Sequence, residues 1–258
     1  MKLTILGSGT SVPHPRRASS AHWLQTACGS VLLDIGAAAV HRMAAEGLDW
    51  PNLDAVWISH FHLDHIGGLA PFLFGTRHAA ETSERSKPLV IFGGQGLKRL
   101  FRRMDQAGNF KLMQQPFPLE IREVAPRTEF EILPGLAART FSTMHTRESL
   151  AIRLTDQNQA SLAYTSDTGY TEALGRFAQG AQLFLMECSF WRNKPLETHL
   201  ELADAMRLAR LAEPLRVVLT HLYPEWDEVD IPRQAARLWS GETIAATDGL
   251  RLTIENKS

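Results

Sequence analysis

The chain has 258 residues, 44% of them hydrophobic, and its formal net charge is −1. This composition is ordinary for a globular protein with a substantial core, and the near-zero charge argues against a global basic field that would gather nucleic acid. No apolar run approaches the roughly 20 residues of a membrane-spanning helix, and the N-terminal run is far shorter than that of a signal peptide. Two cysteines, Cys28 and Cys188, are too few for a disulfide framework. We therefore expect a cytoplasmic protein without membrane contact.

Short apolar segments rich in β-branched residues recur along the chain, each closed by Gly, Asp, Ser or His, and they predict buried strands. In chain order these strands are Leu3–Leu6, Val31–Leu33, Ala55–Ile58, Leu89–Phe92, Ser161–Thr165, Leu183–Met186 and Val217–Thr220. Helical patterns lie between several of them, at Ala37–Glu46, Gly96–Asp105, His199–Glu213 and Pro232–Ser240. This order predicts an α/β protein, and the lack of repeats or long linkers favours a single domain over residues 1–258.

The C-terminal region carries a turn signal between two apolar segments. Asp248-Gly249 separates Thr243–Ala246 from Leu250–Ile254. This dipeptide favours the type I′ turn of a β-hairpin, since both of its residues tolerate positive φ. We therefore expect the chain to end in two strands that pair with each other in antiparallel fashion.

Basic side chains gather around one predicted helix. They are Lys98, Arg99, Arg102, Arg103 and Lys111. A charge run of this kind most often marks a solvated helix face, which is our interpretation, although a local patch that contacts nucleic acid stays open.

Three imidazoles and one carboxylate lie within six residues directly after the third predicted strand, namely His60, His62, Asp64 and His65. Histidines two residues apart point the same way in extended backbone, while the adjacent Asp64 and His65 can diverge in a loop and serve a second centre. A lone histidine is more often a core or surface group than a ligand, but packing does not explain this density. The cluster predicts a metal site, and imidazole with carboxylate suits zinc, and also iron or manganese.

The His-x-His-x-Asp-His segment resembles the metallo-β-lactamase superfamily, in which a later histidine, an aspartate and a final histidine complete the site. Three residues match these positions: His145 follows a stretch of alternating apolar residues that ends near Phe141 and predicts a further strand, and Asp167 and His221 stand just beyond predicted strands. Open α/β sheets gather their ligands at this end of the strands. The resemblance implies a four-layer αβ/βα sandwich over almost the whole chain.

The resemblance also implies how the ligands divide between two divalent ions. One ion takes His60, His62 and His145. The other takes Asp64, His65 and His221. Asp167 bridges both. Two cations that share an anionic oxygen leave positions open for a bridging hydroxide near neutral pH, which would be the nucleophile of a hydrolase.

Several shorter features look like the ribonuclease Z branch of that superfamily, among them Leu6-Gly-Ser-Gly-Thr and Met186-Glu187-Cys-Ser-Phe. The chain departs from the branch in two ways. Met186 stands where the branch has a histidine, and only about 20 residues separate His145 from Asp167, which leaves no room for the arm that grips tRNA. Because phosphate contacts supply most nucleic-acid affinity, a small phosphodiester is favoured over RNA as substrate. A homodimer is an expectation from the resemblance alone.

Glu187 and His199 are the candidates for proton delivery, beside Asp64 as a third candidate catalytic residue. Thr198 and Glu201 form a capping box, which predicts that His199 lies in the first turn of a helix, where free amides favour a phosphate-like anion. In the family that this chain resembles, such a pair helps to protonate the leaving oxygen of a phosphodiester.

Other functions stay open at this point. The same two metals would hydrolyse thioesters, lactones or β-lactams, where they polarise a carbonyl. An iron-dependent oxidoreductase of the same fold is a second class, and a noncatalytic binding module is a third, which the intact ligand set opposes.

Overall fold

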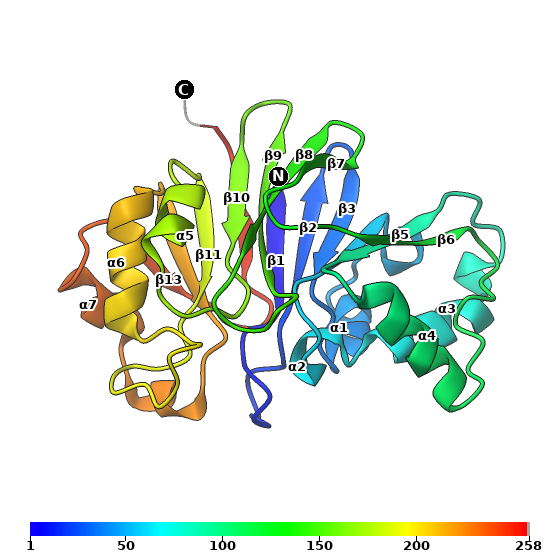
Figure 1. Ribbon diagram of the computed structural model, residues 1–258, viewed down its shortest axis with the longest axis horizontal. Helices are drawn as coiled ribbons and strands as arrows, with labels where there is room; N and C mark the ends of the chain where they lie inside the picture. The colour runs from blue at the N-terminus through cyan, green and yellow to red at the C-terminus, as the bar shows by residue number, and fades with distance from the viewer. Residues whose placement is uncertain (257–258) are drawn as a thin grey trace.

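The computed structural model describes residues 1–256, which form two facing sheets of seven strands each (Figure 1). The first sheet has the order β14 (Arg251–Thr253), β1 (Lys2–Gly7), β2 (Ala21–Thr26), β3 (Gly29–Leu33), β4 (Ala55–Ile58), β5 (Leu89–Gly93) and β6 (Leu119–Glu123). The second has the order β13 (Glu242–Ala245), β12 (Arg216–Thr220), β11 (Leu183–Glu187), β10 (Ser161–Tyr164), β9 (Leu150–Asp156), β8 (Leu136–Ser142) and β7 (Glu129–Leu133). In each sheet an antiparallel half is followed by a parallel half, β3 to β6 and β10 to β13.

Helices cover the outer face of each sheet, so the layers run helix, sheet, sheet, helix (Figure 1). The first sheet is covered by α1 (Ala39–Ala45), α3 (Leu69–His78) and α4 (Leu97–Ala107). The second is covered by α5 (Glu172–Phe177), α6 (Leu202–Ala212) and α7 (Ile231–Ala236). The expected four-layer α/β sandwich is therefore confirmed. No helix within residues 1–256 has both the length and the apolar character that a membrane span requires.

The apolar strands are buried on both faces, which explains why they lack polar alternation. In β4, Ala55 and Trp57 pack into the core between the sheets, whereas Val56 and Ile58 pack under the helices. Successive side chains point to opposite faces of a strand, so a strand covered on both sides must be apolar throughout. All seven predicted strands are present. The unpredicted β2, β6, β7 and β9 carry polar or charged residues and lack that signal.

The prediction of a C-terminal hairpin is wrong. β13 pairs with β12 in the second sheet, while β14 pairs with β1 in the first. The segment between them crosses from one sheet to the other. There the carboxylate of Asp248 accepts hydrogen bonds from the backbone N–H groups of Ser8 (2.9 Å) and Ala18 (2.8 Å), so this aspartate ties down the loop after β1.

The predicted helix start at Thr198 is also wrong, because α6 begins at Leu202 with Glu201 as its N-cap. The backbone before it is extended and pairs with Phe190, whose N–H donates to the carbonyl of Leu200 and whose carbonyl accepts from the N–H of Leu202. This tertiary pairing overrides the local capping signal. His199 therefore lies in a loop ahead of the helix and gains no helix dipole.

A close backbone contact holds the short helix α2 (Leu63–Ile66) against the segment that follows β3. The N–H of Gly68 donates to the carbonyl of Ile35 (2.8 Å), and the N–H of Ile35 donates to the carbonyl of His65 (2.7 Å). A Cβ atom at Gly68 would lie 2.5 Å from the carbonyl oxygen of Gly36, closer than atoms can approach. Only glycine fits this position.

We expect Gly68→Ala to lower the free energy of unfolding by about 1–3 kcal/mol, because the backbone must shift to admit the methyl group. Gly75→Ala in α3 is the matched control. No neighbouring atom lies within 4 Å of its Cβ position, and alanine in a helix interior gains about 0.5–1 kcal/mol. Urea denaturation compares the two variants, and equal stabilities would contradict the contact.

Candidate metal centre

The seven candidate ligands come from both sheets and meet at one edge of the sandwich. His60, His62, Asp64 and His65 follow β4. The others follow β8, β10 and β12, and they are His145, Asp167 and His221. Their ligand atoms form two groups, within each of which all atoms lie within 4.8 Å of one another. The structure thus brings together all seven residues that the sequence predicted as ligands.

The first group consists of three imidazoles and one carboxylate oxygen. Nδ1 of His62 lies 3.0 Å from Nε2 of His60 and 3.0 Å from Nε2 of His145. Oδ2 of Asp167 lies 3.7 Å from each of these two Nε2 atoms. Four donor atoms from three segments of the chain therefore surround one small volume.

The second group has two imidazoles and two carboxylates. Oδ2 of Asp64 lies 3.6 Å from Nε2 of His65 and 3.3 Å from Nε2 of His221. Oδ1 of Asp167 lies 3.2 Å and 3.4 Å from the same two nitrogens. Asp167 thus presents one oxygen to each group, which is the arrangement of a bridging ligand.

The donor set fits metal ions better than it fits a hydrogen-bond network. Ligands at zinc–nitrogen distances of about 2.0–2.1 Å in a tetrahedron are about 3.3 Å apart, close to the separations observed. Among residues 1–256, the buried atoms His65 Nε2 and Asp167 Oδ1 have no hydrogen-bond partner. An imidazole carries at most one proton on each nitrogen, so His62 Nδ1 cannot satisfy both facing nitrogens through protons. The residues present suit a pair of cations.

The protonation states of several ligands also suit metal binding. Burial lowers the pKa of His60 and of His145. Burial alone would raise the pKa of Asp167, but the charges of His221 and His65 hold it well below its usual range. In His65, Asp167 and a second carboxylate outweigh burial and raise the pKa. Neutral imidazoles and ionised carboxylates are the forms that bind metals, so a cation at His65 must displace a proton.

That second carboxylate belongs to Asp34, which the sequence analysis missed. Oδ2 of Asp34 accepts hydrogen bonds from His65 Nδ1 (2.7 Å), Ser59 Oγ (2.8 Å) and Tyr164 Oη (2.7 Å), and Oδ1 accepts the N–H of Ser59 (2.8 Å). These bonds turn Nε2 of His65 toward the second ligand group. Asp34 follows a predicted strand directly, and the same strand-end signal that singled out Asp167 could have found it.

Two other ligand rings are held in the same way through their outer nitrogens. His145 Nδ1 donates to the carbonyl of Thr198 (3.1 Å), which leaves the Nε2 lone pair free to bind a metal. His221 Nδ1 lies 3.0 Å from Ser189 Oγ. Such outer hydrogen bonds fix the tautomer and orientation of metal-binding histidines.

His199 lies beside both ligand groups. Its ring centroid is 4.8 Å from that of His145 and 5.7 Å from that of His221. Its Nδ1 lies 2.9 Å from Oε1 of Glu187. Burial alone would lower the pKa of His199, but the hydrogen bond and charge of Glu187 outweigh burial and raise it. The pair therefore favours a protonated imidazole next to the candidate metal centre.

The carboxylate of Glu187 is fully occupied by the protein. Oε1 accepts the N–H of Thr168 as well as His199, and Oε2 accepts the N–H groups of Ser189 and Leu200 and the Ser189 hydroxyl. Although ligand atoms of Glu187, His199 and His221 also come within 4.8 Å of one another, these hydrogen bonds account for that cluster without an ion. The contacts assign Glu187 to the orientation of His199.

A family model described as anti-Pycsar protein Apyc1 matches residues 1–240. The chain belongs to this family. The matched range contains all seven candidate ligands and every strand except β13 and β14.

Individual relatives place this family member in the metallo-β-lactamase superfamily. The chain is 25% identical to the probable metallo-hydrolase YhfI of Bacillus subtilis (strain 168), over 96% of this chain and 98% of that protein. The crystal structure of YhfI has a TM-score of 0.83, with 24% identity, over 97% of this chain and 98% of that chain. Ribonuclease Z of Bradyrhizobium diazoefficiens is 24% identical over 95% of this chain and 97% of that protein. The short form of human tRNase Z has a TM-score of 0.80, with 20% identity, over 99% of this chain and 100% of that chain. The chain is thus related to a probable metallo-hydrolase and to ribonuclease Z, and it shares their fold.

The interval between His145 and Asp167 confirms the expected lack of an arm. It is filled by β9 and β10, which pair in antiparallel fashion and are joined by a short turn. The structure describes every residue of this interval, and it contains no further helix or strand.

We expect Asp34→Asn to weaken metal binding at the second ligand group about 10–100-fold, because His65 loses its charged hydrogen-bond partner. Competition with a chromophoric chelator measures the affinities. Asp54→Asn is the control, since Asp54 accepts the N–H of Ser30 and the ammonium of Lys87 away from the ligands. Unchanged metal affinity in Asp34→Asn would contradict this assignment.

Removing metal should lower the melting temperature by about 5–10 °C, because binding stabilises only the folded state and empty ligands repel or lack partners. Calorimetry on chelated and zinc-reloaded protein measures the shift. The same treatment of Asp167→Ala should give a smaller shift. Coincident melting curves of the chelated and reloaded wild-type protein would show that folding and metal binding are not coupled.

Proposed function

We propose that the chain is a dinuclear metal-dependent phosphodiesterase that acts on small phosphodiesters. The observation that carries the proposal is Asp167, which faces one ligand group with Oδ2 and the other with Oδ1. A single carboxylate between two imidazole-rich groups suits two ions rather than one, and such groups favour zinc.

When bound, the two ions would supply Lewis acidity and lower the pKa of a water bound to them to about 7. The protein's own residues perform the other tasks. Asp167 fixes the spacing of the two groups. His199, held protonated by Glu187, lies where it can give a proton to a leaving oxygen. Proton donation matters most for an alkoxide, which is a poor leaving group. A proton donor therefore favours phosphodiesters that expel an alkoxide over substrates whose leaving group departs without a proton.

The proposed substrate is small because the chain lacks the features that hold a long polyanion. The interval between His145 and Asp167 contains only a strand pair, and the net charge is −1. Phosphate contacts provide most of the affinity for nucleic acids and require many basic residues. Two relatives carry the name ribonuclease Z or tRNase Z, which supports phosphodiester chemistry, while the missing arm disfavours tRNA.

We expect turnover of bis(p-nitrophenyl) phosphate by the zinc-loaded protein, its loss on chelation, and a fall of about a thousandfold or more in kcat/KM for Asp167→Ala. Asp156→Ala is the control, because Asp156 ends β9 beside the start of β10, whereas Asp167 follows the other end of β10. Cleavage of thioesters or lactones with no phosphodiesterase activity at any metal loading would replace this proposal with carbonyl hydrolysis. Predominant iron together with oxygen consumption would indicate redox chemistry instead.

Replacing His199 should reveal its role through the leaving group. We expect His199→Gln to lower kcat about 10²–10⁴-fold for a diester that expels an alkoxide, and far less for one that expels p-nitrophenolate, which needs no proton. Glu187→Gln should follow the same pattern with a smaller loss. Equal losses for both leaving groups would contradict proton donation.

A further inference from the structure

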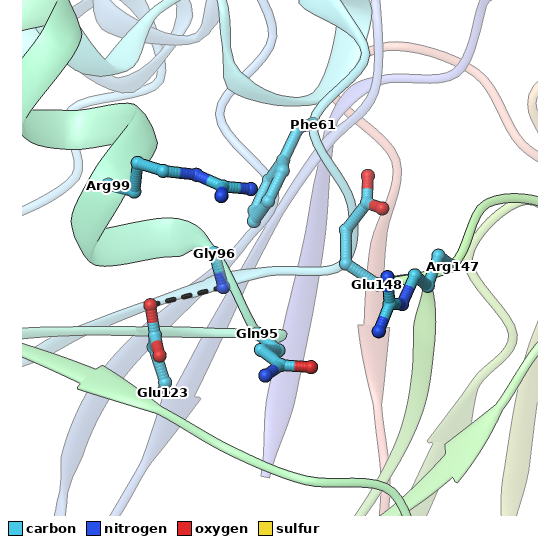
Figure 2. A pocket seen from close by; sticks show the side chains of 7 residues that line it. All are labelled: Phe61, Gln95, Gly96, Arg99, Glu123, Arg147 and Glu148. Atoms are coloured by element: carbon cyan, nitrogen blue, oxygen red, sulfur yellow. Dashed lines mark hydrogen bonds between the residues drawn. The ribbon is translucent and has the colours of Figure 1, made fainter.

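A polar pocket of about 500 Å³ is lined in part by residues that adjoin the candidate ligands in the chain. Figure 2 shows its lining, which consists of Phe61, Gln95, Gly96, Arg99, Glu123, Arg147 and Glu148. Phe61 stands between the candidate ligands His60 and His62 in the chain, and Arg147 follows His145 by two residues. The pocket lining therefore includes chain neighbours of three candidate ligands.

Two guanidinium groups from different parts of the chain line this pocket. Arg99 comes from α4 and Arg147 from the loop between β8 and β9 (Figure 2). Neither forms an ion pair with a carboxylate in the part of the chain that the structure describes, and both are exposed. An arginine without a partner keeps its whole set of donors available for a ligand.

One oxygen of the Glu123 carboxylate is engaged by the start of α4. Oε1 of Glu123 accepts the N–H groups of Gly96 (3.1 Å) and Lys98 (2.9 Å) at the start of α4, as Figure 2 shows for Gly96. The negative charge of Glu123 therefore compensates the positive end of the α4 helix dipole, and it forms no ion pair with Arg99. The pocket thus holds two guanidinium groups and the carboxylates of Glu123 and Glu148, of which only Glu123 is hydrogen-bonded to the start of α4.

Arg99 and Phe61 both lie near a glycine of the pocket. Gly96 has φ +104°, a conformation that other residues rarely adopt. A Cβ atom built there would lie 3.5 Å from Cε2 of Phe61 and 3.7 Å from Nη2 of Arg99. The ring of Phe61 and the guanidinium of Arg99 thus both lie next to the bare glycine backbone.

We propose that this pocket binds a second phosphate group of the substrate through Arg99 and Arg147, an inference that rests on the proposed phosphodiesterase activity. The planar fork of arginine matches a phosphate with two parallel charge-assisted hydrogen bonds. The basic residues of α4 next to Arg99 add a favourable field. Arg99 is thus a member of the basic cluster with a binding role, whereas Arg103 does not line the pocket.

The test compares two substrates that differ only in the second phosphate, thymidine 5′-(4-nitrophenyl phosphate) and the same compound with a 3′-phosphate. We expect the extra phosphate to raise kcat/KM of the zinc-loaded enzyme about tenfold or more. In the double variant Arg99→Ala/Arg147→Ala this ratio should fall toward one. Arg103→Ala, on the same helix, should keep the wild-type ratio. Arg147→Lys, which retains charge but loses the fork, should give an intermediate ratio.

A wild-type ratio near one, or a ratio unchanged in the double variant, would overturn the inference while leaving the proposed activity in place. If neither compound is hydrolysed, the proposed function fails. A binding measurement then tests separately whether the pocket holds a phosphate group. Calorimetric titration with thymidine 3′,5′-bisphosphate and thymidine 5′-monophosphate should then show tighter binding of the bisphosphate, lost in the double variant. Equal affinities would overturn the phosphate site itself.

Discussion

The position of Asp167 between two ligand groups is the constraint to which the other residues of the site conform. Its carboxylate is buried, and its two oxygens face different sets of imidazoles. A buried carboxylate surrounded by histidine nitrogens is stable only if positive charge compensates it. Metal ions provide that charge without leaving buried nitrogens unpaired. The proposed chemistry depends on this arrangement, while outer hydrogen bonds orient the ligand rings and Glu187 raises the pKa of His199.

The two sheets each supply part of the centre, so their packing determines its geometry. A hydrogen bond from Tyr164 on β10 to Asp34 after β3 joins the sheets directly behind His65. The parallel strands end at the same edge of the sandwich, and their apolar residues are buried on both faces. The large core thus fixes the distances between ligands from distant parts of the chain.

The sequence predicted the parts of this protein that local patterns determine. The apolar strands and the dense run His60–His65 were found because burial and metal chemistry restrict residue type there. His199 was assigned to a helix because a capping box is a local signal, whereas the pairing with Phe190 that overrides it is a tertiary contact. Asp34 lacked a motif. The left-handed backbone of His221, with φ 58°, also depends on the folded environment.

The proposed dinuclear centre requires that one carboxylate, that of Asp167, is shared by two ions. A crystal of the zinc-loaded protein, measured with X-rays on both sides of the zinc absorption edge, would locate the ions without reference to activity. We predict two anomalous peaks about 3.5–4 Å apart, one in each ligand group, with one oxygen of Asp167 directed at each. A single peak, or two peaks of which one lies away from Asp167, would contradict the dinuclear centre.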